Sequence, residues 1–400
     1  MTGPAGWVFF AFLFGGAIAL ASAVARYAKV PYTVVLVIAG FAIGLLHLTT
    51  APTITPGLVM YVFLPPLLFA AAWEMDLGSL RRWWLPVALL ATVGVALGVA
   101  ITYVVLRFGA HVDSPVAIAF GVLVAATDPV AVIALFRELR IDKGLSTIVE
   151  GESLFNDGVA VVLVRSLVLG AASGAIGAGS TDFAYAAFEF AALTAGGAAI
   201  GILIGIVASA LLRATSSPAV EVAITIVAAF GAYVSGEAVH ASGIVAVICA
   251  GLTCSVARSR AGASVVATAA VDRFWESAAL VANSVLFVLV GLSIQVGSLA
   301  IAGAAAAWGI GAVLLSRALV VYGIMRVTSR AGSRAPQRWD HVVALGGLRG
   351  ALAMALVLSL PENFHDRGML VSMVYSIVLF TLVVQGLMLR PVMRSLGLSG

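Results

Sequence analysis

The sequence predicts an all-α polytopic membrane protein, and three observations support this prediction. Of its 400 residues, 62% are hydrophobic and only 10% are charged, whereas a soluble domain has about 25% charged residues. Nearly the whole chain divides into apolar runs of about 20 residues, which is the length that one helix needs to cross a bilayer. The alternating pattern of a membrane barrel is absent, and helices satisfy every backbone polar group within lipid.

Hydropathy and the spacing of Gly, Pro and charged residues predict about thirteen spans. If the N-terminus is placed outside, most of the 22 Lys and Arg residues fall in inside loops. Outside loops then contain only Arg107 and Arg367. The positive-inside rule therefore predicts an odd number of spans with the N-terminus outside and the C-terminus inside. We expect an integral protein of a bacterial-type plasma (inner) membrane, without a soluble domain and without nucleic acid as a partner.

Thirteen spans can be divided into six, one and six, as in transporters that are built from two inverted repeats. The fifth span contains Thr127, Asp128 and Pro129, and the twelfth contains the glycine-rich segment 346–350. Each of these two spans is the fifth helix of its six-helix block. Pro129 lacks an N–H and clashes with the preceding turn, and glycines weaken a helix. The sequence thus predicts that helices 5 and 12 are broken, and that a binding site forms at the breaks.

A polar cluster at residues 150–158 leads into an apolar run. On a helix, Ser153, Asn156 and Asp157 stand at positions i, i+3 and i+4 of one face, so their oxygens can converge. Hard oxygen ligands of this kind suit a small hard cation. A helix cap explains Glu150, but it does not explain Asp157, which lies about two turns further on. Because ionisable residues within a membrane are costly and usually functional, we expect Asp157 to be at the centre of a cation site.

Further charges lie within predicted spans, namely Asp128, Arg165, Arg317 and Arg349. Asp128 makes an ordinary proline kink a poor explanation of the fifth span. Arg349 needs a carboxylate partner at its depth, and Glu152 is the expected one. This pair would be structural, since it would brace two helices and leave Asp157 free. The alternative for Arg349 is a side chain that extends to the membrane interface, if its span begins near Leu348.

Four segments together resemble a known family, namely residues 63–69, 127–132, 150–159 and 346–351. They are similar to the sodium/proton antiporters of the monovalent cation–proton antiporter superfamily. The Asn-Asp pair at 156–157 is similar to the electroneutral branch of that superfamily. The match extends over nearly the whole chain and keeps its order.

The resemblance implies a homodimer with about thirteen helices per subunit, in which broken helices 5 and 12 cross at the site. It also implies a mobile core part, including 53–169 and 274–360, and a dimer or scaffold part, including 1–48 and 183–258. The resemblance assigns roles to the polar residues as well: Asp157, Ser153 and Thr127 as Na+ ligands, Asn156 as an orienting residue, Asp128 as a charge that balances helix ends, and Glu152 with Arg349 as a structural ion pair. No cofactor is implied besides the transported Na+ and H+.

One position departs from the family pattern. Many members have an acidic residue directly after a Pro-Pro-Leu-Leu-Phe string, where this chain has Ala70. Glu74 lies one turn further on and could replace it. The site therefore has either one ligand fewer or a displaced one, and this leaves the choice among Na+, Li+ and K+ open.

A single buried carboxylate suggests a mechanism. Burial disfavours the charged form of Asp157, and either a proton or a monovalent cation can neutralise it. The neutral carrier can reorient, whereas the bare anion cannot cross the low-dielectric barrier cheaply. One-for-one exchange by alternating access follows. The alternatives are a monovalent cation channel, although the sequence has no carbonyl filter or acidic ring, and a K+/H+ antiporter. An enzyme is not expected, because no nucleophile–base pair or metal-ligand spacing is present.

Overall fold

The computed structural model describes residues 15–16, 18–21, 23–25, 27, 31–46, 57–169, 180–260, 265–293, 296–333 and 335–398. All regular elements within these ranges are helices, so the all-α prediction is confirmed. Six helices in the described part of the chain are long and apolar enough to cross a membrane, and shorter apolar helices accompany them. The predicted first span lies mostly outside the described residues, and the total of about thirteen spans stays a prediction.

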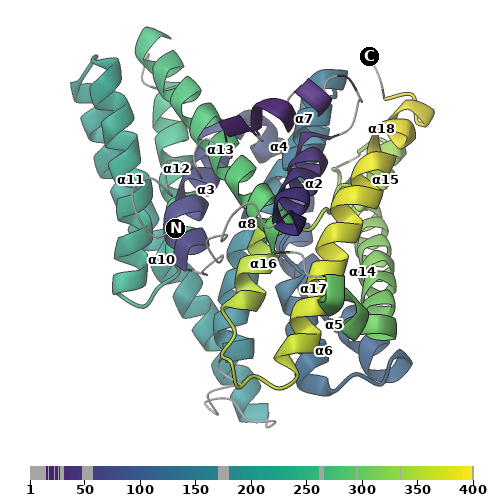
Figure 1. The fold of residues 1–400 in the computed structure, drawn as a ribbon. Coiled ribbons are helices and arrows are strands. Elements are labelled where there is room, and N and C mark those ends of the chain that lie inside the picture. Colours follow the sequence, from purple (N-terminus) through teal and green to yellow (C-terminus); the bar gives the residue numbers. More distant parts are fainter. Residues whose placement is uncertain are drawn as a thin grey trace.

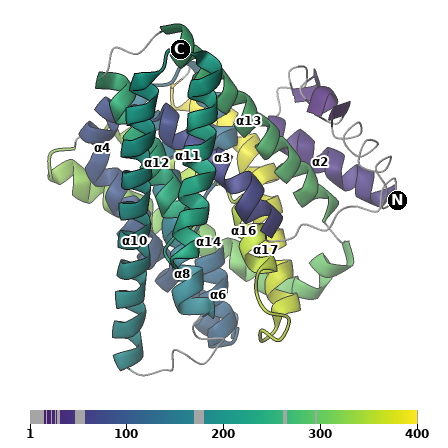
Figure 2. The same ribbon diagram turned by 90° about the vertical axis from the view of Figure 1, so that its left-hand side faces the viewer.

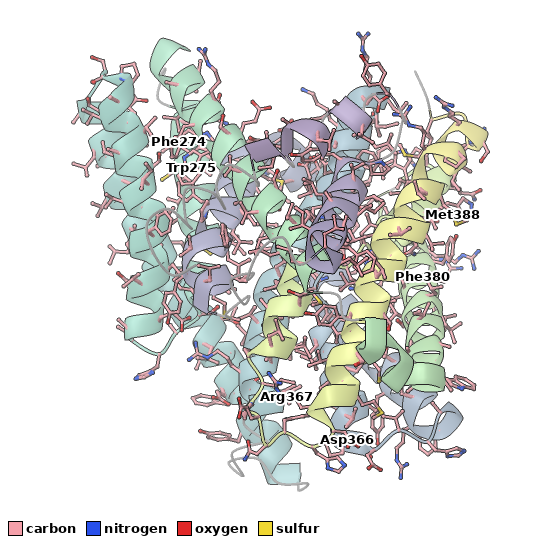
Figure 3. The ribbon with its side chains drawn as sticks, in the orientation of Figure 1. Phe274, Trp275, Asp366, Arg367, Phe380 and Met388 are labelled. Carbon is pink, nitrogen blue, oxygen red and sulfur yellow. The ribbon has the colours of Figure 1, made fainter. Side chains whose placement is uncertain are left out.

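The helices pack in two groups (Figures 1 and 2). The first, called here the α10 group, comprises α2 (Tyr32–Leu45), η1 (Leu58–Phe63), α3 (Leu64–Glu74), α10 (Ser180–Ala214), α11 (Pro218–Ala238), α12 (Gly243–Arg260) and α13 (Val265–Leu292). Within it, α12 packs on α3, α10 and α11, and α13 packs on α2 and α3. Trp275 of α13 packs against Phe69 of α3 with tilted rings whose centroids are 4.6 Å apart, and Figure 3 labels it on the same side of the molecule as α10 and α11.

The second, called here the α8 group, contains the rest of the described helices. They are α4 (Leu77–Leu89), η2 (Leu90–Gly94), α5 (Val95–Val104), η3 (Val105–Gly109), α6 (Ser114–Leu123), α7 (Val130–Leu139), α8 (Lys143–Leu163), η4 (Val164–Leu169), α14 (Val296–Arg330), α15 (Gln337–Leu345), α16 (Ala351–Leu358), α17 (Arg367–Phe380), η5 (Thr381–Gln385) and α18 (Gly386–Ser395). Here α8 packs on α4, and α14 packs on α5 and α17. Figure 3 shows α17 running from Arg367 at one end of the molecule towards Met388 of α18 at the other.

The contacts do not follow the expected core ranges at every point. The ranges 53–169 and 274–360 include α3 and most of α13, yet both helices pack mainly within the α10 group. Between the groups, α8 contacts α3, α10 and α12, and α16 contacts α13.

Both predicted helix breaks are present. The fifth span is divided into α6 and α7, with residues 124–129 non-helical between them, and the twelfth is divided into α15 and α16 by residues 346–350. The two non-helical stretches touch, because the Asp128 N–H donates to the Leu348 carbonyl at 2.7 Å. A Cβ atom on Gly350 would overlap the Asp128 carboxylate, so the close crossing requires glycine at this position.

Candidate cation site

The crossing brings together the ends of four half-helices, whose partial charges need compensation. Asp128 lies at two N-terminal, partly positive ends. Its Oδ1 accepts a hydrogen bond from the Val130 N–H at the start of α7, at 3.0 Å. Its Oδ2 lies against Gly350, directly before α16. Asp128 is therefore placed between two helix starts, and the charge-balancing role that the family resemblance implied stays a prediction.

Arg349 lies near a C-terminal, partly negative end. Its Nη1 donates to the carbonyl oxygens of Ala125 and Ala126 at 2.6 and 3.1 Å, just after α6 ends. Its backbone N–H donates to Thr381 Oγ1 at 3.0 Å. Arg349 is 6% exposed. The alternative, in which its side chain extends to the interface, is thus wrong, because the unwound carbonyls hold its guanidinium within the protein.

The expected Glu152–Arg349 ion pair is also wrong, because Glu152 is paired with another arginine. Arg317 of α14 donates from Nη1 and Nη2 to the two Glu152 carboxylate oxygens at 2.8 and 3.0 Å. Arg317 Nη2 also donates to the Val343 carbonyl near the end of α15, at 2.9 Å. This two-pronged geometry is the strong form of an arginine–carboxylate contact. Arg317 therefore braces α8 against α14 and α15, as Arg349 had been expected to brace two helices.

The side chains of α8 divide between two cavities. Glu152 and Asn156 line a small cavity of about 40 Å3, together with Arg317 and Arg349. Ser153 and Asp157 line a cavity of about 350 Å3 on the other side. Adjacent residues of a helix are about 100° apart, and here Asn156 lines the small cavity while Asp157 lines the large one. The predicted convergence on one point therefore applies to Ser153 and Asp157, whereas Asn156 lies behind them.

Thr127 connects the two sides. Its carbonyl oxygen accepts a short hydrogen bond from Ser153 Oγ. Asn156 Nδ2 donates to the Ala125 carbonyl at 2.7 Å and to Thr127 Oγ1 at 3.3 Å. Thr127, Ser153 and Asp157 line the large cavity together with Asp128. The unwound segment is thus held against α8 by two side chains, and its Thr127 oxygens stay next to the Asp157 carboxylate.

Asp157 differs from the other acidic residues of the site. Its Oδ1 is buried and accepts no hydrogen bond from any residue that the structure describes. Around it, Arg317 and Arg349 carry two positive charges, and Glu152 and Asp128 carry two negative charges in contacts already described. These four charges cancel. The ionised Asp157 carboxylate is therefore the uncompensated charge of the site, and a proton or a monovalent cation would neutralise it.

The large cavity extends from Asp157 to a charged mouth. Arg137, at the end of α7, donates to Glu74 at 2.8 Å and lies 3.8 Å from Glu276. The Arg137 and Glu276 side chains are 60% and 65% exposed. Ala70 also lines the cavity, and is itself buried. Glu74 is bound to Arg137 at the mouth in this conformation, so its replacement of the missing acid at Ala70 stays a hypothesis.

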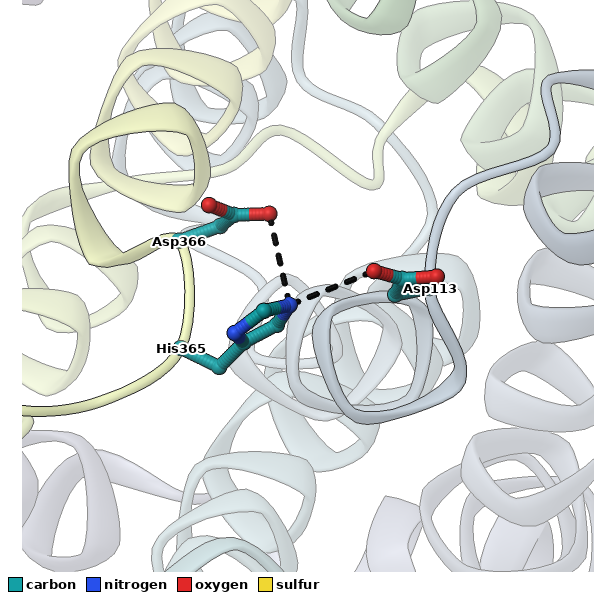
Figure 4. A group of neighbouring side chains, drawn as sticks. All are labelled: Asp113, His365 and Asp366. Carbon is teal, nitrogen blue, oxygen red and sulfur yellow. Dashed lines mark hydrogen bonds and ion pairs between the residues drawn. The ribbon is translucent and has the colours of Figure 1, made fainter.

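A second polar cluster lies outside the site. Asp113 precedes α6, and His365 and Asp366 precede α17 (Figure 4). His365 Nε2 lies 3.2 Å from Asp113 Oδ2 and 3.5 Å from Asp366 Oδ2. All three residues are exposed. Because α6 and α7 are the two halves of one crossing, the start of α6 and the Arg137 end of α7 lie at opposite ends of it, and the cluster is remote from the cavity mouth.

The sequence also did not reveal the partners of Arg317 and Arg165. Both fall within apolar spans, and an intramembrane arginine predicts a carboxylate partner but not which one. Arg165 pairs with Glu237 at 3.2 Å. The depth of an arginine within a span thus indicates that it has a partner. The packing of helices that are distant in the sequence determines which carboxylate that partner is.

The fold and the site define a helical integral membrane protein with one uncompensated negative charge, which a cation can neutralise, beside two broken helices. Over residues 11–395 the chain matches the family described as the transmembrane sodium/hydrogen exchanger. The chain belongs to this family.

Relatives and a solved structure agree with this assignment. The chain is 36% identical over 377 residues to the low-affinity Na+/H+ antiporter NhaS1 of Synechocystis sp., which covers 93% of this chain and 71% of that protein. It is 36% identical over 378 residues to the Na+/H+ antiporter ApNhaP of Aphanothece halophytica, with 94% and 71% covered. The structure of the sodium proton antiporter MjNhaP1 from Methanocaldococcus jannaschii at pH 8 aligns with a TM-score of 0.77 at 20% identity, covering 98% of this chain and 100% of that one. This likeness shows the antiporter fold.

Proposed function

We propose that the chain is a secondary active transporter that exchanges Na+ for H+ one for one, with Asp157 as the site that both ions share. The observation that carries the proposal is the uncompensated Asp157 carboxylate beside the crossing of the broken helices. The names of the relatives, which are Na+/H+ antiporters, favour exchange over a channel or a K+/H+ antiporter.

The ligands proposed for Na+ are oxygens that the structure brings to one wall of the large cavity. Asp157 supplies a carboxylate oxygen, and Thr127 and Ser153 supply a carbonyl and hydroxyls. A carbonyl or hydroxyl oxygen that takes part in one hydrogen bond still has a lone pair for a cation. Asn156 serves as an orienting residue, because it holds Thr127 in place. Asp128 contributes to the field at the site and stabilises helix ends.

Exchange follows from competition at Asp157. A bound proton or a bound Na+ makes the site neutral, and the neutral α8 group can then move relative to the α10 group. The empty anionic site reorients poorly, since a bare charge in a low-dielectric barrier is costly. Because one ion replaces the other on one carboxylate, the complete cycle moves no net charge.

We place the cavity mouth at the cytoplasmic face of a bacterial-type inner membrane. The mouth lies at the end of α7 and the end of α3, where the positive-inside rule put the inside loops. With this orientation the N-terminus is outside and the C-terminus inside. We further propose that two copies associate as a homodimer through the α10 group, whose helix α10 carries exposed apolar side chains at Leu203, Ile206 and Val207.

The test is a sodium gradient across proteoliposomes that contain the purified protein and a pH indicator. Sodium efflux should acidify the lumen, because protons enter as sodium leaves. The rate should stay the same when the membrane potential is clamped at zero. Sodium-driven currents without proton movement would support a channel, and a response to potassium alone would support a K+/H+ antiporter.

A further inference from the structure

We propose that Arg165 and Glu237 are positioning residues for the exchange cycle, because their ion pair holds closed the side of Asp157 that lies away from the cavity mouth. The inference rests on the proposed exchange function, since it assigns a state of that cycle to this structure. It concerns a contact between the two helix groups.

The pair joins elements that belong to different groups. Arg165 lies on η4, which continues α8 and carries the side chain about two turns, roughly 12 Å, beyond Asp157. Its Nη1 lies 3.2 Å from each Glu237 carboxylate oxygen and 3.5 Å from the Ala241 carbonyl. Glu237 Oε1 also accepts from the Gly243 N–H at the start of α12, at 3.1 Å. Arg165 is thus fastened to the turn between α11 and α12.

The direction along α8 decides which side the pair closes. The mouth residue Arg137 precedes α8 in the chain, whereas Arg165 follows Asp157 on it. The large cavity is lined by Arg137, Glu74 and Asp157, and Arg165 is not among its lining residues. Asp157 is therefore reached from the Arg137 side, and the Arg165–Glu237 pair lies on the opposite, closed side.

Partial burial makes the Arg165–Glu237 ion pair unfavourable to break. The Arg165 and Glu237 side chains are 32% and 27% exposed, so both are partly withdrawn from solvent. If the groups separated at this point, an arginine within an apolar run would lose its carboxylate, which is unfavourable. The Arg317–Glu152 pair has both members in the α8 group and can move as a unit. The contact that must break when the site opens to the other side is the Arg165–Glu237 contact.

A weaker ion pair between the two helix groups lies at the cavity mouth. Arg137 of the α8 group reaches Glu74 of the α10 group, but the Arg137 side chain is 60% exposed and the cavity stays open beside it. Exposed ion pairs contribute little because water screens them. The difference between the two pairs favours the conformation in which Asp157 faces the mouth. Loss of the Arg165–Glu237 pair should shift the ratio of the two conformations by about fivefold towards the opposite one.

The experiment measures opening of the closed side with a cysteine reporter. Ile248 of α12 is 2% exposed, and its Cδ1 lies 3.5 Å from where a Cβ on Gly158 of α8 would stand, so its side chain is covered by the contact between the two groups. In a background of Cys249→Ala and Cys254→Ala, Ile248→Cys is labelled with a polar maleimide in purified, detergent-solubilised protein. Arg165→Gln and Glu237→Gln should each raise the labelling rate about fivefold. Because labelling needs no ion movement, its result stands apart from the gradient assay of exchange.

The controls distinguish the loss of the Arg165–Glu237 ion pair from a non-specific loss of stability. The charge-reversed double variant Arg165→Glu/Glu237→Arg should return labelling towards the starting rate, which a local packing defect would not do. Asp272→Asn breaks an ion pair with Arg258 inside the α10 group and should leave the rate unchanged. Equal labelling in Arg165→Gln, Glu237→Gln and the starting protein would overturn the proposal. So would an increase that Asp272→Asn reproduces. If Arg165→Gln does not fold, Glu237→Gln and the reversed pair decide the matter by the same measurements.

Discussion

Replacement of Arg317 by glutamine removes the cation that faces the buried Glu152 carboxylate. The wild-type side chain makes two hydrogen bonds to Glu152, at 2.8 and 3.0 Å, and one to the Val343 carbonyl, at 2.9 Å. Glu152 is 2% exposed, so water cannot replace these contacts. Breaking a buried pair by removing one partner costs about 3–5 kcal/mol. For a chain of 400 residues, this corresponds to a fall in Tm of roughly 5 °C.

The assay is thermal unfolding of purified variants in detergent. Arg317→Gln should melt well below the wild type. The double variant Glu152→Gln/Arg317→Gln should recover much of the loss, because it leaves no unpaired charge. Glu138→Gln is a matched control, since it breaks the Arg390–Glu138 pair, in which the Glu138 side chain is 55% exposed, and should cost less than about 1 kcal/mol. An Arg317→Gln variant with the wild-type Tm, or a double variant no better than the single one, would refute the reasoning.

Three further predictions concern the crossing and the site. Gly350→Ala should lower the exchange rate at least about tenfold, because a Cβ atom would displace the Asp128 carboxylate; a wild-type rate in the gradient assay would contradict this. Ser153→Ala should raise the KM for sodium about tenfold with little change in Tm, since a cation ligand and the bond to Thr127 are lost. The KM for sodium should rise as the pH falls, because protons compete for Asp157. A KM that does not change between about pH 6 and pH 9 would argue against a shared site.

Much of the site could be predicted from local sequence. Pro129 and the glycines of 346–350 break helices for steric and entropic reasons that do not depend on the rest of the fold. Asp157 stands out because an acid deep in an apolar run is costly wherever the helix packs. These features are local, and the structure shows both breaks where they were expected.

The pairing of charges could not be predicted in the same way. Arg317 and Arg349 both lie within spans, and each needs an anionic or carbonyl partner. Which one meets Glu152 depends on how α14 and the unwound part of the twelfth span pack against α8. The breaks themselves created carbonyl acceptors at Ala125 and Ala126, and these hold Arg349. Helical periodicity likewise put Asn156 and Asp157 in one polar cluster, although two cavities lie on the two sides of α8.

The most direct test of the shared site is proton release on sodium binding. Purified protein in weakly buffered detergent solution, with a pH indicator, is titrated with sodium chloride, and choline chloride serves as the control for ionic strength. The account predicts that one proton leaves for each sodium bound, and that Asp157→Asn releases none. Sodium binding without proton release, or the same release from Asp157→Asn, would contradict it.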